Sequence, residues 1–134
     1  MTHRKSRTIE LRSERGQSLT EFALALPILA LLLFAVIQFG ITFNNYVTLV
    51  DATRAGARKG AVGRQQSNPS SAVVAAVKSS AANLNQSQLG VTVSSTWQPS
   101  SDVTVTATYP YHISLLGLVV KSGNLSSTTT ERVE

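Results

Sequence analysis

The chain has no cysteine, and only two of its 134 residues are histidine. The lack of cysteine excludes disulfide scaffolds, thiolate metal sites and cysteine nucleophiles. His3 and His112 lie far apart in the sequence, so we expect no metal site built on histidine.

Charged residues are also scarce, at 14%, and the net charge of +5 is unevenly placed. Residues 1–64 hold nine Lys/Arg against four Asp/Glu, whereas residues 65–134 hold three against three. A nucleic-acid-binding domain would carry a basic face on its folded part. The excess of basic residues near the N-terminus instead favours a membrane-associated protein, with no nucleic-acid partner.

A catalytic constellation is missing as well. Residues 65–134 contain one Asp, one His and two Glu at the extreme end, and no base stands near the many Ser and Thr in a recognisable arrangement. No glycine-rich loop of the phosphate-binding kind is present. We therefore predict no enzyme activity, no catalytic residue, no cofactor, no metal and no small-molecule substrate.

What the chain does contain is a long apolar segment, Phe22 to Phe43, interrupted by Gln38. As a helix its 22 residues span about 33 Å at about 1.5 Å per residue. A hydrocarbon core is about 30 Å thick, so the segment predicts one transmembrane helix. Pro27 predicts a kink near its start or simply marks that start.

Basic residues flank this segment on both sides. Five Lys/Arg precede it and three follow within twenty residues, which favours a cytoplasmic N-terminus and a C-terminal domain outside. A secretory signal peptide, which would release a soluble domain, is less well supported. Its apolar region is usually 7–15 residues long, and here the pattern stays helical over 44–63 without a cleavage site of small residues.

The entrance to the apolar segment carries a further pattern. Gly16 ends the basic leader, and Glu21 follows five residues later, directly before Phe22. An unpaired carboxylate in a membrane costs several kcal/mol, so an acid there calls for a partner. Alternatively, Ser18 and Glu21 form a capping box at a helix start.

These residues resemble the TadE-like family, minor pseudopilins of the tight-adherence (Flp) type IV pilus system. The likeness covers most of the chain and is strongest over residues 15–60. It rests on the motifs Arg15-Gly-Gln-Ser-Leu-Thr-Glu-Phe-Ala-Leu-Ala-Leu-Pro-Ile-Leu29, Ile37-Gln-Phe-Gly40, Ala52-Thr-Arg-Ala-Gly-Ala-Arg58, Val103-Thr-Val-Thr-Ala-Thr-Tyr-Pro-Tyr111 and Leu125-Ser-Ser-Thr-Thr-Thr-Glu-Arg-Val-Glu134.

The resemblance implies that a prepilin peptidase cuts between Gly16 and Gln17. Glu21 then becomes the fifth residue, and its carboxylate pairs with the new amine of Gln17 in the same or a neighbouring subunit. Main Flp pilins have Glu-Tyr here, whereas this chain has Glu21-Phe22. The implied partners are membrane lipid, prepilin peptidase and other pilins or pilus-assembly proteins. The implied location is the bacterial cytoplasmic membrane, with incorporation into a surface pilus.

The fold class expected is α+β and pilin-like. It divides the chain into a basic leader (1–16) that is cleaved, a transmembrane and extended helix (17–63), and a small extracytoplasmic domain (64–134). Within the helix, Thr48, Ala52, Gly56 and Gly60 lie four apart and form a smooth stripe. Such a stripe predicts close packing against another subunit or against the C-terminal domain, unless Gly60 or Gly63 simply ends the helix. Asp51 and Arg54 predict a surface ion pair.

The C-terminal domain is expected to hold a short helix on a small antiparallel sheet. After a polar break at 64–71, Ser70 or Ser71 caps a helix over 72–84. Alternation predicts strands over 91–97 and 102–109, joined by a link at 98–101 and ended by Pro110, with a third strand over 125–133.

The apolar residues 113–120 are too few to span a membrane. Core packing is the outcome expected for them, with a patch on the membrane or on a partner as the alternative. For the whole chain, the alternative to a pseudopilin is an unprocessed membrane-anchored protein whose outer domain binds an envelope or protein partner.

Overall fold

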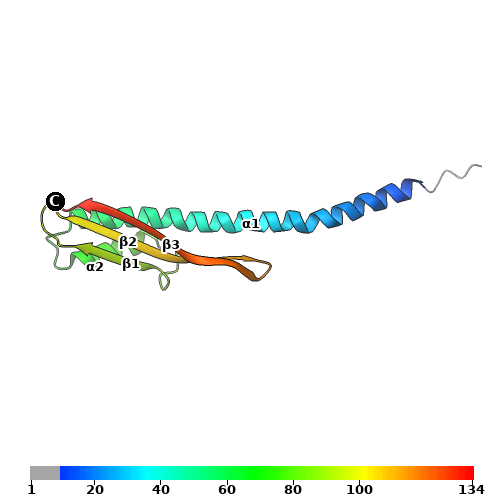
Figure 1. The fold of residues 1–134 in the computed structure, drawn as a ribbon. Helices are drawn as coiled ribbons and strands as arrows, with labels where there is room; N and C mark the ends of the chain where they lie inside the picture. Colours follow the sequence, from blue (N-terminus) through cyan, green and yellow to red (C-terminus); the bar gives the residue numbers. More distant parts are fainter. Residues whose placement is uncertain (1–9) are drawn as a thin grey trace, which may run out of the picture. The chain divides into compact units, whose positions relative to one another are not determined.

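The computed structural model describes residues 10–134, with side chains from residue 16 onward. The chain divides into two compact units, Met1–Ile37 and Gln38–Glu134. Helix α1 (Glu10–Ala61) contributes to both of them. An α+β protein with a long apolar N-terminal helix, a short helix and a three-stranded antiparallel sheet was expected, and this architecture is confirmed (Figure 1).

The first unit consists, in its described part, of α1 alone. The helix runs through Pro27 without ending, and its side chains from Gly16 to Ile37 are exposed except for the half-buried Ala30. It is long and apolar enough to cross a membrane. The helix already exists at Glu10, so the alternative of a capping box at Ser18 and Glu21 is wrong, because neither residue stands at a helix start.

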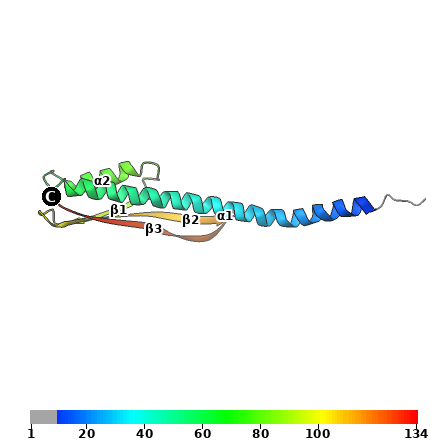
Figure 2. The same cartoon turned by 90° about the horizontal axis from the view of Figure 1, so that it is seen from above.

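The second unit has two layers. Residues 38–61 of α1 and helix α2 (Pro69–Ser80) cover one face of a sheet with the order β1-β2-β3, as Figure 2 shows. The strands are β1 (Gly90–Ser95), β2 (Asp102–Leu115) and β3 (Leu118–Arg132), and both pairings are antiparallel. Strict alternation in β2 turns Val103, Val105 and Ala107 toward the helices, where all three are fully buried.

Polar residues cover the opposite face of the sheet. Thr104 lies opposite Thr130, and Thr106 opposite Thr128, with hydroxyl oxygens 3.0 and 2.9 Å apart. Cross-strand threonine pairs of this kind stabilise an antiparallel sheet while leaving one face wet. The threonine-rich sequence thus gives an amphipathic sheet whose apolar face needs the two helices.

Helix α2 begins earlier than the sequence suggested. Its N-cap is Asn68, whose Oδ1 accepts a hydrogen bond from the Ser71 amide at 3.1 Å, and Pro69 occupies the first turn. Asparagine is a strong N-cap and proline is well suited to a first helical position. The expected caps at Ser70 or Ser71 are therefore wrong. The helix also ends at Ser80, before the expected Leu84.

The largest difference lies in the hairpin of β2 and β3. The expectation that Pro110 ends the second strand is wrong, since β2 continues to Leu115 and Pro110 pairs with Asn124. In this outer part β2 pairs with β3 alone, because β1 reaches only to Thr108. Proline is tolerated on a strand with one free edge.

Candidate functional site

The first candidate site is the entrance of the apolar helix, in the first unit. Gln17 and Glu21 are one turn apart, and the Gln17 Nε2 donates to Glu21 Oε1 at 3.0 Å. The Thr20 hydroxyl donates to the carbonyl oxygen of Gly16 at 3.0 Å. Residues 16–22 are all exposed, so the Glu21 carboxylate is open to a cation from outside the chain.

Gly16 is not required by packing in this structure. A Cβ built on it would meet nothing within 4 Å, although glycine costs a helix about 1 kcal/mol relative to alanine. Packing in this fold therefore does not explain the glycine at this position, and the same is true of Gly40. A protease that needs an extended backbone would first have to unwind α1 here.

The second candidate site is the stripe of small residues in the second unit. At Gly56 a Cβ would overlap Val77 of α2 and lie 3.4 Å from Val105 of β2. At Gly60 a Cβ would come within 2.9 Å of Val103. The two glycines let α1 approach α2 and β2 closely, which is the role that small residues have at helix contacts. The sequence left open whether the stripe packs against another subunit or against the C-terminal domain. At Gly56 and Gly60 it packs against the chain's own C-terminal domain.

The remaining members of the stripe differ from each other. Ala52 is fully buried in the core, whereas Thr48 is half-buried and its hydroxyl accepts from Asn83 Nδ2 at 3.4 Å. Helix α1 ends at Ala61, and the Glu134 amide donates to the Ala61 carbonyl at 2.9 Å. The last residue of the chain thereby satisfies an orphan carbonyl of α1.

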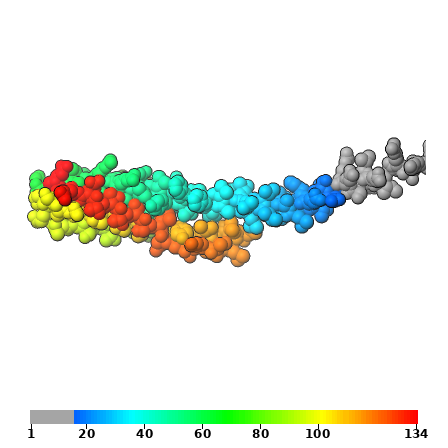
Figure 3. Space-filling view, turned by 45° about the horizontal axis from the view of Figure 1, so that its top comes forward, coloured from blue at the N-terminus to red at the C-terminus, as the bar shows by residue number. Residues whose placement is uncertain are grey.

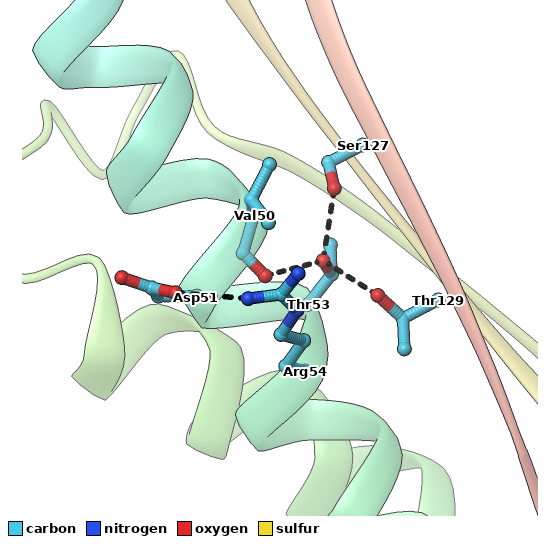
Figure 4. A network of polar contacts seen from close by, with 6 residues as sticks. All are labelled: Val50, Asp51, Thr53, Arg54, Ser127 and Thr129. Carbon is cyan, nitrogen blue, oxygen red and sulfur yellow. Dashed lines mark hydrogen bonds and ion pairs between the residues drawn. The ribbon is translucent and has the colours of Figure 1, made fainter.

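A buried hydroxyl network joins α1 to β3 (Figure 4). Thr53 is fully buried, and its Oγ1 donates to the Val50 carbonyl at 2.9 Å. The hydroxyl oxygens of Ser127 and Thr129 each lie 3.0 Å from Thr53 Oγ1. A hydroxyl has one proton and two lone pairs, so Thr53 donates once and accepts from both β3 residues.

The sequence reasoning missed this network. Thr53 belongs to a motif that it did single out, and the β3 residues belong to a run of Ser and Thr that predicted a strand. Two signals could have revealed it. Thr53 lies on α1 beside the small residues of the stripe, and Ser127 and Thr129 alternate along one face of β3.

The described residues hold no group of three or more His, Cys, Asp or Glu that could bind a metal. Beside the stripe, Arg54 and Asp51 form the expected surface ion pair at 3.7 Å. Both side chains are exposed, as are Arg58 and Lys59. The described residues thus present contact surfaces on α1 and an exposed polar segment at the entrance of its apolar part.

Comparison with known proteins adds the family. Residues 16–58 match the family model described as TadE-like protein, and this segment lies entirely within α1. No curated protein and no solved structure matched the chain. Helix α1 is a candidate membrane span over Gly16–Ala61. Together with the family match, it supports a membrane protein associated with the tight-adherence pilus. The match over residues 16–58 is to the family that the motifs of the sequence predicted, and it supports the TadE-like assignment.

Proposed function

We propose that this protein is a single-pass membrane pseudopilin that contributes to assembly of a tight-adherence type IV pilus after processing by a prepilin peptidase. The observation that carries the proposal is the family match, which begins at Gly16 and covers the apolar segment. The leader 1–16 is removed, and the processed N-terminus is Gln17. The second unit then lies outside the cytoplasmic membrane, as the five preceding and three following basic residues favour.

Glu21 supports this proposal through its position. Its carboxylate is exposed and already accepts a hydrogen bond from Gln17, one turn away on the same helix face. Cleavage at Gly16 creates an amine at Gln17 beside that carboxylate. In an apolar setting each group neutralises the other, whether the two belong to one subunit or to neighbours.

Gly16 supports processing for a second reason. Its missing side chain is unexplained by packing, in contrast to Gly56 and Gly60. A protease cleft that accepts an unwound helix favours a residue without a Cβ, because glycine adopts extended and other backbone conformations freely.

Intact-mass measurement of the membrane-extracted protein tests the cleavage. The expected mature chain begins at Gln17, and Gly16→Val should leave the leader attached. Gly40→Val is the matched control, because a Cβ at Gly40 also meets nothing within 4 Å, and it should be processed normally. A native chain that begins at Met1 would rule out processing and favour the unprocessed membrane-anchored protein. A chain that begins near residue 45 would favour a secreted domain.

The role of Glu21 has its own test. Glu21→Gln keeps an acceptor for the Gln17 amide but removes the charge, so it should abolish pilus assembly while membrane insertion stays intact. Thr20→Ala, which removes the neighbouring hydroxyl bond, is the control and should assemble. Unchanged pilus output from Glu21→Gln would contradict a charge-pairing role.

A further inference from the structure

The end of the β2–β3 hairpin is an exposed apolar surface. We define the hairpin tip as residues Leu116–Val120, whose large side chains are all exposed, with Leu116 76% exposed. Core packing was expected for residues 113–120. It is wrong for the tip, whereas Ile113 and Leu115 are half-buried. The orange hairpin end reaches out from the body of the second unit in Figure 3.

The turn at the tip has an unusual residue. Leu116 and Gly117 have φ values of 52° and 82°, the left-handed conformation of a two-residue hairpin turn. Asparagine or aspartate is preferred at the first position because other side chains are strained there. A leucine that is both strained and exposed favours an external apolar partner for the tip.

Contacts along α1 show which way the hairpin points. Gly60 meets Val103, Gly56 meets Val105, and Thr53 meets Ser127, which pairs with Ala107. The strand therefore advances toward its tip as α1 runs back toward Gln38. With rises of about 3.3 Å per strand residue and about 1.5 Å per helix residue, His112 lies level with about residue 42 of α1.

That level is where the apolar segment of α1 ends, at Phe43. The tip continues beyond His112 for four residues, or about 13 Å at the rise of a strand. If Phe43 lies at the outer surface of the bilayer, the tip lies within the outer leaflet.

The composition of this end of the second unit is consistent with lipid. Its exposed large apolar residues gather on α1 at 39–47 and at the tip, apart from Val62 at the opposite end. Residues 38–50 and 103–120 contain no Lys, Arg, Asp or Glu. The first charge after the tip is Lys121, whose long side chain can reach back to the headgroups.

The geometry points to a membrane contact: the hairpin tip inserts into the outer leaflet of the bilayer that α1 crosses. Insertion stays within the outer leaflet, because a two-stranded hairpin has free edges and unpaired backbone groups are not tolerated deep in the hydrocarbon core. The second unit would then have two attachments to the membrane, α1 and the tip. This inference depends on the membrane span but not on processing or on the pilus.

The cysteine-free chain allows a direct test. Val119→Cys in the full-length protein is labelled with an environment-sensitive fluorophore and reconstituted into phosphatidylethanolamine–phosphatidylglycerol vesicles that carry lipid-attached quenchers. Val62→Cys is the matched control, since Val62 and Val119 are 66% and 64% exposed and lie at opposite ends of the unit. Leu32→Cys, at the centre of the apolar segment, reports the membrane span.

The lipid quenchers should reduce emission from Val119→Cys and Leu32→Cys but not from Val62→Cys. Quenching at Leu32 alone, with Val119 open to soluble iodide, would overturn the inference and leave the span intact. A Val119 probe shielded from both quenchers and cross-linked to a second copy would overturn it in favour of a subunit interface. No quenching at Leu32 would overturn the membrane span together with the inference.

A second variant keeps the turn while changing the tip. Leu116→Asn places the preferred residue beside Gly117, so the hairpin should form and become less apolar. Lipid quenching of the Val119 probe should then decrease. Unchanged quenching would show that the apolar tip does not drive insertion.

Discussion

The two units use the same helix in opposite ways. From Gly16 to Ile37, α1 presents large apolar side chains that are exposed. From Leu49 to Gly60, it buries small residues against α2 and the sheet. A helix that is apolar all round needs lipid or other helices, whereas a helix with one smooth stripe can pack within its own domain. The difference teaches that, along one helix, large apolar residues and small residues have different roles: the large ones make α1 hydrophobic, and the small ones let it pack closely.

Substitution of a glycine in the packed part of α1 should have the largest effect on stability. Gly56→Leu should lower the free energy of unfolding of the second unit by about 3 kcal/mol, because even a Cβ would overlap Val77. Gly40→Leu, the matched control, should leave it unchanged. Trp97 is the single tryptophan and packs against this core, so its fluorescence during denaturant titration in detergent measures the effect. Equal effects of the two changes would contradict the close packing of α1 at Gly56, since both glycines lie in the second unit.

A charge tests the other part of α1. Leu32→Arg places a cation at the middle of the apolar segment and should disfavour membrane insertion by about 2.5 kcal/mol. The unfolding midpoint reported by Trp97 should stay unchanged, since Leu32 belongs to the first unit. Membrane fractionation measures insertion, with Leu32→Ala as the control. Normal insertion of the arginine variant would contradict a transmembrane role for this segment.

The buried network gives the next largest effect. Thr53→Val keeps the shape of the side chain but removes the oxygen that accepts from Ser127 and Thr129. Loss of a buried acceptor should cost about 2 kcal/mol of unfolding free energy. The same change at Thr128, on the exposed face of the sheet, should cost less than about 1 kcal/mol. A Thr53 effect no larger than that of Thr128 would show that the network adds nothing to stability.

The surface ion pair gives the smallest effect. Asp51→Asn breaks its contact with Arg54, but both side chains are more than 60% exposed, so water and salt screen the attraction. The expected loss is a few tenths of a kcal/mol, and added salt should remove it. A loss above about 1 kcal/mol in high salt would point to a role for Asp51 other than the ion pair.

The sequence predicted the order of the elements but was less accurate about where they end. Local alternation gave β1 and the inner part of β2 correctly, because alternating Val and Thr require one buried and one wet face. The inner part of β3 was predicted from its threonine content. The outer hairpin was missed because proline usually stops a strand. Only the strand pairing shows that β2 continues past Pro110 with a free edge, since β1 pairs with it no further than Thr108. Asn68 was missed as a cap because Ser70 and Ser71 compete for the same role in the sequence.

The candidate sites follow the same division. The pattern of Gly16, Glu21 and Phe22 was identified from spacing. The roles of these residues and of Gln17 in cleavage and assembly were implied by the family resemblance, and they stay predictions. Thr48, Ala52, Gly56 and Gly60 were identified as a stripe, but spacing could not say what lies against it. The structure places Val77, Val103 and Val105 against the two glycines, from segments that follow them by about 20 to 50 residues.

By itself, the sequence determined the properties that depend on neighbouring residues. These are the long apolar helix, the family motifs and the alternation of the strands. Only the tertiary structure decided which long-range contacts form. The Thr53 network and the contacts of the glycine stripe depend on residues that are distant in the chain. The tertiary structure also decided that the tip is exposed. The apolar residues 113–120 are buried or exposed according to where the sheet ends, and a local sequence pattern does not specify where a sheet ends.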